Sequence, residues 1–376
     1  MALAVPPSAP SGPAPPSRSP AAYLPNETLA AIFEYLLPPA LARTALVSRR
    51  WRAIAERILY STVVIAETIP RTSPAPFKNM PDAPAVPSRT LRCCETLSHN
   101  PHLADVVRRF HLRWETESVE SPAFLLVIAQ NIMQTLIPTF THLESLELLL
   151  GLAPHIPEGF REHFPAFTVP SLRHLSLGGM GDSPAQLLRN HPGLLHFKLA
   201  DYHAPLALAP ADVPRLVSFR GNPVTAASIL PGRPVHWLSL VGWEFVTEQD
   251  LARIAQTSTP IRTLDLSAMS VTPILLRDIS RHLSSIEFLR VKLALRHTLH
   301  FALSGIRLLA ALTTVLGEFQ ELRALDLSPT NAEQQLCLSW MRACPSLRRI
   351  TFPSKTEWTL VDGGFWIAEM QGCSSR

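Results

Sequence analysis

Apolar residues recur along most of the chain in the arrangement LxxLxL, where positions 4 and 6 alternate with polar neighbours. Complete copies start at Leu143, Leu172, Leu194, Val235, Ile261, Ile286 and Leu322, and degenerate copies start at Val107, Leu216 and Leu347. The alternation predicts a short half-buried strand in each copy, and position 1 brings the incoming turn into the core. A strand this short is not stable alone, so the copies must pack on one another.

Helical patterns separate these strands. Examples are TEQDLARIAQ from Thr247, TPILLRDISRHL from Thr272 and EQQLCLSWMRAC from Glu333, often opened by Thr or Ser. The copies start roughly 19 to 36 residues apart, within or somewhat beyond the leucine-rich-repeat range. Strand, turn and helix in repetition predict an α/β fold, a curved leucine-rich-repeat solenoid with parallel strands on one face and helices on the other.

A doubly wound α/β domain also alternates strand and helix and is the alternative for the same pattern. About ten strand units exceed an ordinary sheet, and no GxGxxG or GxxxxGK[ST] motif follows any of them. The solenoid is therefore the preferred fold class.

The segment before the repeats has helical rather than strand periodicity. Pro25 suits a first helical turn, and one face then carries Leu29, Ile32, Phe33 and Leu36. Pro38 and Pro39 are expected to stop this helix. A second helix is predicted around residues 40–46 and a third at about 49–59, with a third-helix face made of Trp51, Ile54, Ala55 and Ile58.

Three helices of some 40 residues in total are too few to bury this apolar surface among themselves. The surplus must contact either the neighbouring repeats or a partner protein.

The joint spacing of these residues closely resembles the F-box. The match rests on Leu24-Pro25 with Glu27, Ile32-Phe33, Leu36, Leu41, Val47-Ser48-Arg49, Trp51 and Leu59-Tyr60. The chain as a whole resembles an F-box protein of the fungal type with a C-terminal leucine-rich-repeat-like domain. By this resemblance a Skp-type adaptor binds to Leu24, Pro25, Ile32, Phe33, Leu36, Leu41 and Val47. Trp51 and Tyr60 are expected in the internal packing of the module.

The domain organisation follows from these patterns. Residues 1–22 are almost entirely Pro, Ala and Ser and are expected to be disordered. The F-box is expected at 23–66, a proline-rich linker at 67–88, the leucine-rich-repeat-like domain at 89–355, and a C-terminal cap and tail at 356–376. Trp358, Phe365 and Trp366 would supply the cap, because the end of a solenoid exposes apolar side chains.

Composition and charge limit the classes of partner and the compartment that are expected. The net charge of +4 is small and mixed in sign, and the arginines of the third predicted helix form an ordinary solvated face, so no nucleic acid is expected. No window offers about 20 clean apolar residues, so no membrane span is expected. Five cysteines form no framework and no secretory signal is visible, so we expect an intracellular protein of the cytoplasm, the nucleus or both.

No catalytic, metal or cofactor motif is present: neither GxSxG, HExxH nor paired cysteine ligands occur. The repeats therefore offer a surface, and polar strand positions are the expected substrate contacts. These are Glu147, His174, Lys198, Arg220, Asp265, Arg290 and Asp326, together with Ser176, Ser239 and Arg348. The alternative for each is an ordinary solvated face.

The resemblance implies a non-catalytic subunit of a Skp, cullin and F-box ubiquitin ligase that binds an unknown protein substrate through the repeats. An interaction scaffold that uses the same F-box without cullin is the alternative. A hydrolase or transferase built on the repeats would require turnover by the chain alone.

Overall fold

The computed structural model describes residues 24–69, 86–116, 122–151, 167–179, 183–242, 246–269, 271–291, 313, 315–327, 333–352, 356–361 and 365–370. The chain divides into two compact units, Met1–Ser61 and Thr62–Arg376. The predicted disordered segment 1–22 and most of the predicted linker lie outside the described residues.

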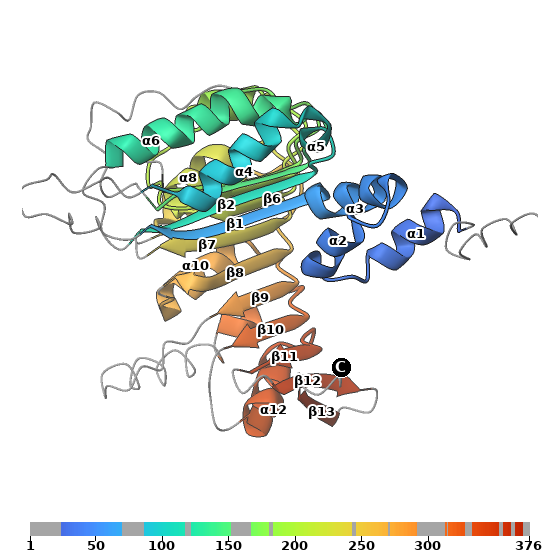
Figure 1. The fold of residues 1–376 in the computed structure, drawn as a ribbon. Helices are drawn as coiled ribbons and strands as arrows, with labels where there is room; N and C mark the ends of the chain where they lie inside the picture. Colours follow the sequence, from blue (N-terminus) through green and yellow to red (C-terminus); the bar gives the residue numbers. More distant parts are fainter. Residues whose placement is uncertain are drawn as a thin grey trace, which may run out of the picture. The chain divides into compact units, whose positions relative to one another are not determined.

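The first unit contains three helices, α1 (Asn26–Phe33), α2 (Pro38–Thr44) and α3 (Arg49–Ser61) (Figure 1). The prediction that Pro38 and Pro39 stop the first helix is wrong. After Phe33 the chain tightens, with the amide of Leu36 donating to the carbonyl of Phe33 at 3.0 Å, and Pro38 is instead the first residue of α2. Proline is favoured there because the first helical N–H has no partner within its helix.

The core of the first unit is small. Leu29 and Phe33 from α1, Leu41 from α2 and Ala55 from α3 are its buried residues. As predicted, Trp51 packs internally, with its ring edge-on to that of Phe33 at a centroid distance of 5.4 Å. One aromatic pair and a few aliphatic side chains thus hold the three helices together.

The second unit is built on a sheet of 13 strands that follow one another in sequence order (Figure 1). The strands are β1 (Thr62–Ile69), β2 (Arg109–Thr116), β3 (Ser145–Leu149), β4 (His174–Gly178), β5 (His196–Leu199), β6 (Ser218–Gly221), β7 (Trp237–Gly242), β8 (Thr263–Met269), β9 (Phe288–Val291), β10 (Ala324–Leu327), β11 (Arg349–Thr351), β12 (Thr356–Val361) and β13 (Phe365–Met370). Pairing is parallel from β1 to β11 and antiparallel from β11 to β13.

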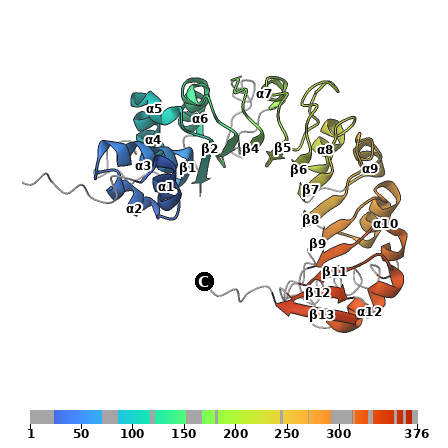
Figure 2. The same cartoon turned by 90° about the vertical axis from the view of Figure 1, so that its right-hand side faces the viewer.

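Helices connect most of the parallel strands and lie on one side of the sheet (Figure 2). They are α4 (Ser88–His99), α5 (Pro101–Ala104), α6 (Pro122–Asn131), α7 (Ala185–Arg189), α8 (Pro223–Ile229), α9 (Glu248–Ile254), α10 (Pro273–His282) and α12 (Glu333–Ala343). The described connections also contain one turn of π-helix, η2 (Ile132–Leu136), and two 3₁₀ turns, η3 (Ile137–Thr139) and η6 (Leu316–Glu318).

This topology confirms the predicted α/β solenoid. All ten LxxLxL copies form strands, β2 to β11, and the three predicted helices are α9, α10 and α12. The doubly wound alternative is wrong, because such a sheet reverses its strand order, whereas these strands run in sequence order.

Three strands were not predicted. β1 begins at Thr62, directly after α3 and inside the range 23–66 expected for the F-box, and it pairs with β2 along its whole length. β12 and β13 form an antiparallel pair beyond the last LxxLxL copy, and Trp366 of β13 is buried. Residues 371–376 of the expected cap and tail lie outside the described residues.

In-register pairing generates the core of the second unit. Position 4 of each copy lies opposite position 4 of the next, giving a continuous buried row of Phe110, Leu146, Leu175, Phe197, Phe219, Leu238, Leu264, Leu289, Leu325 and Ile350. Each strand therefore buries its apolar side chains against both neighbours, as expected of a solenoid.

A polar network joins the first strands of the sheet to α4. The carboxylate of Glu67 in β1 accepts hydrogen bonds from the backbone amides of Arg89 and Thr90, both at 3.0 Å, and from the Thr90 hydroxyl at 2.9 Å. The indole of Trp114 in β2 donates to the same hydroxyl at 3.0 Å. Glu67 thus supplies an acceptor for the unpaired amides at the start of α4, where a negative charge is also favoured by the helix dipole.

We expect Glu67→Gln to lower the free energy of unfolding by about 1–3 kcal/mol, because the side-chain amide replaces one acceptor with a donor that faces N–H groups. Urea unfolding followed by circular dichroism measures the difference. Glu95→Gln, at an exposed position of α4, is the control and should change the stability by less than about 0.5 kcal/mol. Equal effects of the two substitutions would contradict the role assigned to Glu67.

A buried histidine directly after α7 bonds to two backbone groups. His191 is 2% exposed; its Nε2 accepts from the amide of Val169 at 3.0 Å, and its Nδ1 lies 2.7 Å from the carbonyl of Leu187. Because the Val169 amide is a donor, the ring proton must be on Nδ1, which donates to Leu187. Burial lowers the pKa of His191, so the ring is neutral at pH 7.

The folded protein should therefore lose stability as the pH falls through 6.5, since the unfolded chain takes up a proton that folded His191 resists. His191→Gln should be less stable at pH 7.5 but lose less stability between pH 7.5 and about 5. Urea midpoints at several pH values measure both quantities. Parallel pH profiles for the two proteins would mean that His191 does not contribute to the acid sensitivity.

Candidate functional site

Two rows of side chains cross the strand face of the second unit. Positions 3 of β3 to β7 form the first row, which consists of Ser145, His174, His196, Ser218 and Trp237. Positions 5 form the second row, which consists of Glu147, Ser176, Lys198, Arg220 and Ser239. The rows arise because alternate residues of a strand share a face and the strands pair in register.

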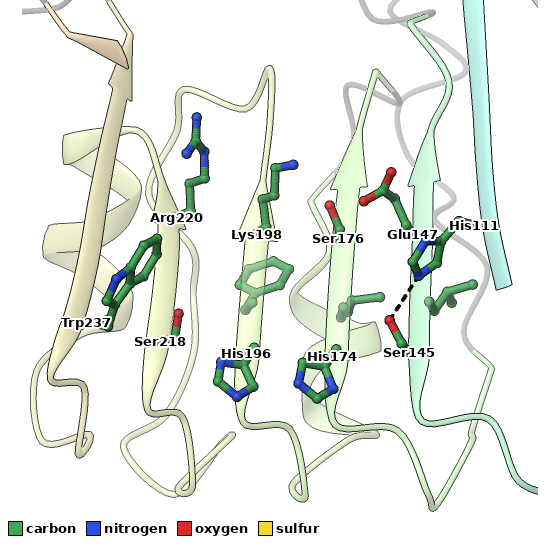
Figure 3. A pocket seen from close by; sticks show the side chains of 13 residues that line it. His111, Ser145, Glu147, His174, Ser176, His196, Lys198, Ser218, Arg220 and Trp237 are labelled. Atoms are coloured by element: carbon green, nitrogen blue, oxygen red, sulfur yellow. Dashed lines mark hydrogen bonds between the residues drawn. The ribbon is translucent and has the colours of Figure 1, made fainter. Parts of the chain in front are cut away.

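A hollow of about 260 Å³ lies over these rows (Figure 3). Its lining combines the first row, the second row from Glu147 to Arg220, His111 of β2, and the apolar positions Leu146, Leu175 and Phe197. We refer to it as the strand-face pocket. Leu146, Leu175 and Phe197 are position-4 residues whose side chains point into the core on the opposite side of the sheet, so the polar and aromatic side chains of the two rows form the accessible surface of the pocket.

Two stacked histidines occupy the middle of the first row. The rings of His174 and His196 lie side by side (Figure 3), with centroids 4.4 Å apart and planes inclined by 4°. Partial burial lowers the pKa of His196, and the neighbouring His174 and His236 lower it further. At pH 7 the His196 ring is therefore neutral, and it presents a flat surface rather than a charge.

His111 closes the pocket at its β2 side. Its Nε2 lies 3.2 Å from the hydroxyl oxygen of Ser145. Partial burial lowers the pKa of His111; Glu147 raises it, while Arg109 and Arg113 lower it. This ring is also neutral at pH 7.

Ion pairs neutralise most of the charges in the second row. Glu147 lies 3.2 Å from the guanidinium of Arg113, and Arg220 lies 3.9 Å from the carboxylate of Asp265. Lys198, between Ser176 and Arg220 in the row, has no carboxylate within ion-pair distance in the described part of the chain. The Ser176 hydroxyl oxygen is buried and has no hydrogen-bond partner among the same residues.

The structure brings together five of the ten predicted substrate contacts. Glu147, His174, Ser176, Lys198 and Arg220 all line the strand-face pocket. The other five lie outside it: Ser239, Arg348, and three residues that continue the second row over β8 to β10. Asp265 is 4% exposed and accepts from the amide of Ser267 at 2.9 Å, while Arg290 and Asp326 form an ion pair at 2.5 Å. Their main contacts are thus within the chain.

His111, Ser145, His196, Ser218 and Trp237 line the pocket but were not among the predicted contacts. The repeat pattern held a signal for all five. His111 is at position 5 of the copy that starts at Val107, and the other four are at position 3 of their copies, which faces the same side as position 5.

The first unit presents exposed apolar side chains near the ends of its helices. Of the predicted adaptor contacts, Ile32 is 47% and Val47 63% exposed, and Pro25 is exposed as well. Leu24 and Leu36 are half-buried against the core. Phe33 and Leu41, at 3% and 4% exposure, are core residues. Apolar side chains that were not predicted as contacts but are largely exposed are Tyr35, Leu37 and Leu46.

Within the described residues no cluster of three or more His, Cys, Asp or Glu side chains is arranged to hold a metal ion. None of the helices described there combines the length and the apolar composition that a membrane crossing requires.

Comparison with known proteins identifies one segment by family. Residues 21–66 match the F-box-like family. None of the curated proteins matches the chain.

Among solved structures, the chain is similar to the leucine-rich repeat-containing protein LegL7 from Legionella pneumophila, with 14% identity, 69% of this chain and 92% of that chain covered, and a TM-score of 0.34. It is also similar to an internalin from Listeria monocytogenes, with 12% identity, 67% and 81% covered, and a TM-score of 0.28.

Proposed function

Given the F-box-like segment at residues 21–66, we propose that this chain is the substrate-recognition subunit of a Skp, cullin and F-box ubiquitin ligase. The first unit would bind a Skp-type adaptor, which links it to a cullin, and the repeats would bind a protein substrate. The observation that carries the proposal is the joining of this segment to a leucine-rich-repeat solenoid, a fold that offers an extended surface for proteins.

The proposed docking surface consists of Ile32, Tyr35, Leu37, Leu46 and Val47. These side chains come from the end of α1 and from the turns on either side of α2, and all five are between 47% and 91% exposed. Burying apolar area yields about 25 cal/mol per Å², so covering several such side chains supplies several kcal/mol. Phe33 and Leu41 are left out, because their side chains stabilise the unit from within.

The surroundings of the four described cysteines fit a chain that does not itself carry ubiquitin. Burial raises the pKa of Cys93, and burial together with the neighbouring Cys93 raises the pKa of Cys94 to about 12. Cys337 and Cys344 are buried. Since the thiolate is the nucleophile, these four thiols are poorly suited to carry ubiquitin. Other subunits would supply that chemistry, and this chain would act by holding the substrate close to it.

Such a function belongs inside the cell, in the cytoplasm, the nucleus or both, where the adaptor, cullin and ubiquitin-carrying subunits operate. The four described cysteines are free thiols, which fits a reducing compartment.

The double variant Ile32→Asp with Val47→Asp should bind a purified Skp-type adaptor at least about ten-fold more weakly than the unmodified chain, because two charges would be buried at the interface. Calorimetric titration measures the affinity. Ile274→Asp, at a 63% exposed position of α10, is the matched control and should bind normally. Failure of the unmodified chain to bind the adaptor would overturn the docking proposal.

In cells, replacing the chain with the Ile32→Asp, Val47→Asp double variant should lengthen the half-life of at least one protein that binds the repeats. A pulse-chase measurement across the proteome, followed by capture on the chain, identifies such proteins. An unchanged set of half-lives would instead favour the non-degradative scaffold. The Ile274→Asp control should degrade the same proteins at the normal rate.

A further inference from the structure

We propose that the strand-face pocket binds an aspartate or glutamate side chain of the protein substrate, with Lys198 as its central contact. The inference rests on the proposed function, since it names the chemistry of the substrate that the repeats would recognise. It depends on the arrangement of charges and donors in the pocket.

Lys198 provides the charge. Its side chain stands in the second row beside Ser176 and Arg220, and all three point toward the same end of the strands (Figure 3). Neighbouring strands of a sheet are about 4.8 Å apart, so one carboxylate bound at Lys198 also lies within reach of the side chains on both sides. No carboxylate of the described chain occupies that position.

Ser176 provides a second donor. Its buried hydroxyl has no hydrogen-bond partner in the described residues, and an unsatisfied buried polar group costs about 1–3 kcal/mol. After rotation of the Ser176 side chain about its Cα–Cβ bond, which would bring the shielded hydroxyl to the surface, a carboxylate oxygen at Lys198 would accept from this hydroxyl as well as from the ammonium group. Binding would therefore remove a cost that the empty pocket carries.

The charge balance favours a single negative charge on the ligand. Arg220 is already paired with Asp265, Glu147 is paired with Arg113, and the lowered pKa values of His111 and His196 keep those rings neutral at pH 7. The pocket is left with the one positive charge of Lys198. A carboxylate matches it, whereas a phosphate group would bring nearly two negative charges to a single compensating cation.

The rest of the pocket strengthens this contact. The stacked rings of His174 and His196 and the half-buried ring of Trp237 lie in the first row, next to the second-row charge. An extended peptide seated on these rings would exclude water from the ion pair, and an ion pair gains strength as the local dielectric constant falls. The same surface would contact the residues that flank the acidic side chain.

The test uses the full-length chain and libraries of short peptides with blocked ends, so that side chains carry every charge of the ligand. One central position is fixed as Asp, Asn, phosphoserine or Lys, and the flanking positions are randomised. Asp peptides should be retained at least about ten-fold better than Asn peptides, as expected for a charge-assisted contact. Equal retention of Asp and Asn, or stronger retention of phosphoserine than of Asp, would overturn the proposal.

Three variants assign the effect to Lys198. Lys198→Met should abolish the preference for Asp, Lys198→Arg should keep it, and Lys198→Glu should shift it to Lys peptides. Arg173→Met, which removes an exposed positive charge just before β4 and outside the pocket, is the matched control and should behave as the unmodified chain. An Asp preference that survives Lys198→Met would contradict the assignment. Unchanged thermal unfolding of each variant excludes a folding defect as the cause.

Adaptor binding is measured on the same Lys198 variants and should be unaffected. If the unmodified chain does not bind the adaptor but prefers Asp peptides, the proposed function is refuted and the carboxylate preference stands. If the unmodified chain binds the adaptor but shows no preference for Asp peptides, only this inference is refuted.

Discussion

In-register pairing of parallel strands is the constraint on which the rest of the second unit depends. It places position 4 of every LxxLxL copy in one buried row and positions 3 and 5 in two rows on the opposite face. A slip of one residue in any strand would move its apolar side chains to the strand face and its polar ones into the core. The hydrophobic pattern therefore fixes not only the core but also which polar side chains become neighbours, and the strand-face pocket is a product of that register.

The local pattern was enough to predict ten of the strands, because each copy combines period-two alternation with an apolar entry residue. The repeat pattern does not predict β1, because TVVIAETI follows α3 without an intervening turn and has no LxxLxL spacing. It does not predict the hairpin of β12 and β13 either, because antiparallel strands at the end of a solenoid belong to no repeat. His196 and Trp237 differ from ordinary surface residues in that they are partly buried. That burial depends on the neighbouring strands, which the local pattern does not specify.

The first unit shows where helical periodicity reaches its limit. The spacing predicts one stripe of Leu29, Ile32, Phe33 and Leu36, yet α1 ends before Leu36. Within the helix, Phe33 is a core residue and Ile32 is nearly half exposed. The apolar stripe is wider than the area that contacts the other two helices, so some of its residues are buried and others stay exposed. Spacing alone does not distinguish the buried residues from the exposed ones. The prolines were misread for a similar reason, since Pro38 can either end one helix or begin the next.

The ion pairs that cross between neighbouring strands have a kinetic consequence. Arg113 with Glu147, Arg290 with Asp326 and Arg349 with Glu357 turn most charges of the face into short dipoles, whose fields decay faster with distance than those of single ions. At physiological ionic strength, where the Debye length is about 8 Å, the paired charges of the described strands attract a partner only at short range. The association rate constant would then be about 10⁵–10⁶ M⁻¹s⁻¹, the value expected without electrostatic steering. Partners would differ in affinity mainly through their dissociation rates.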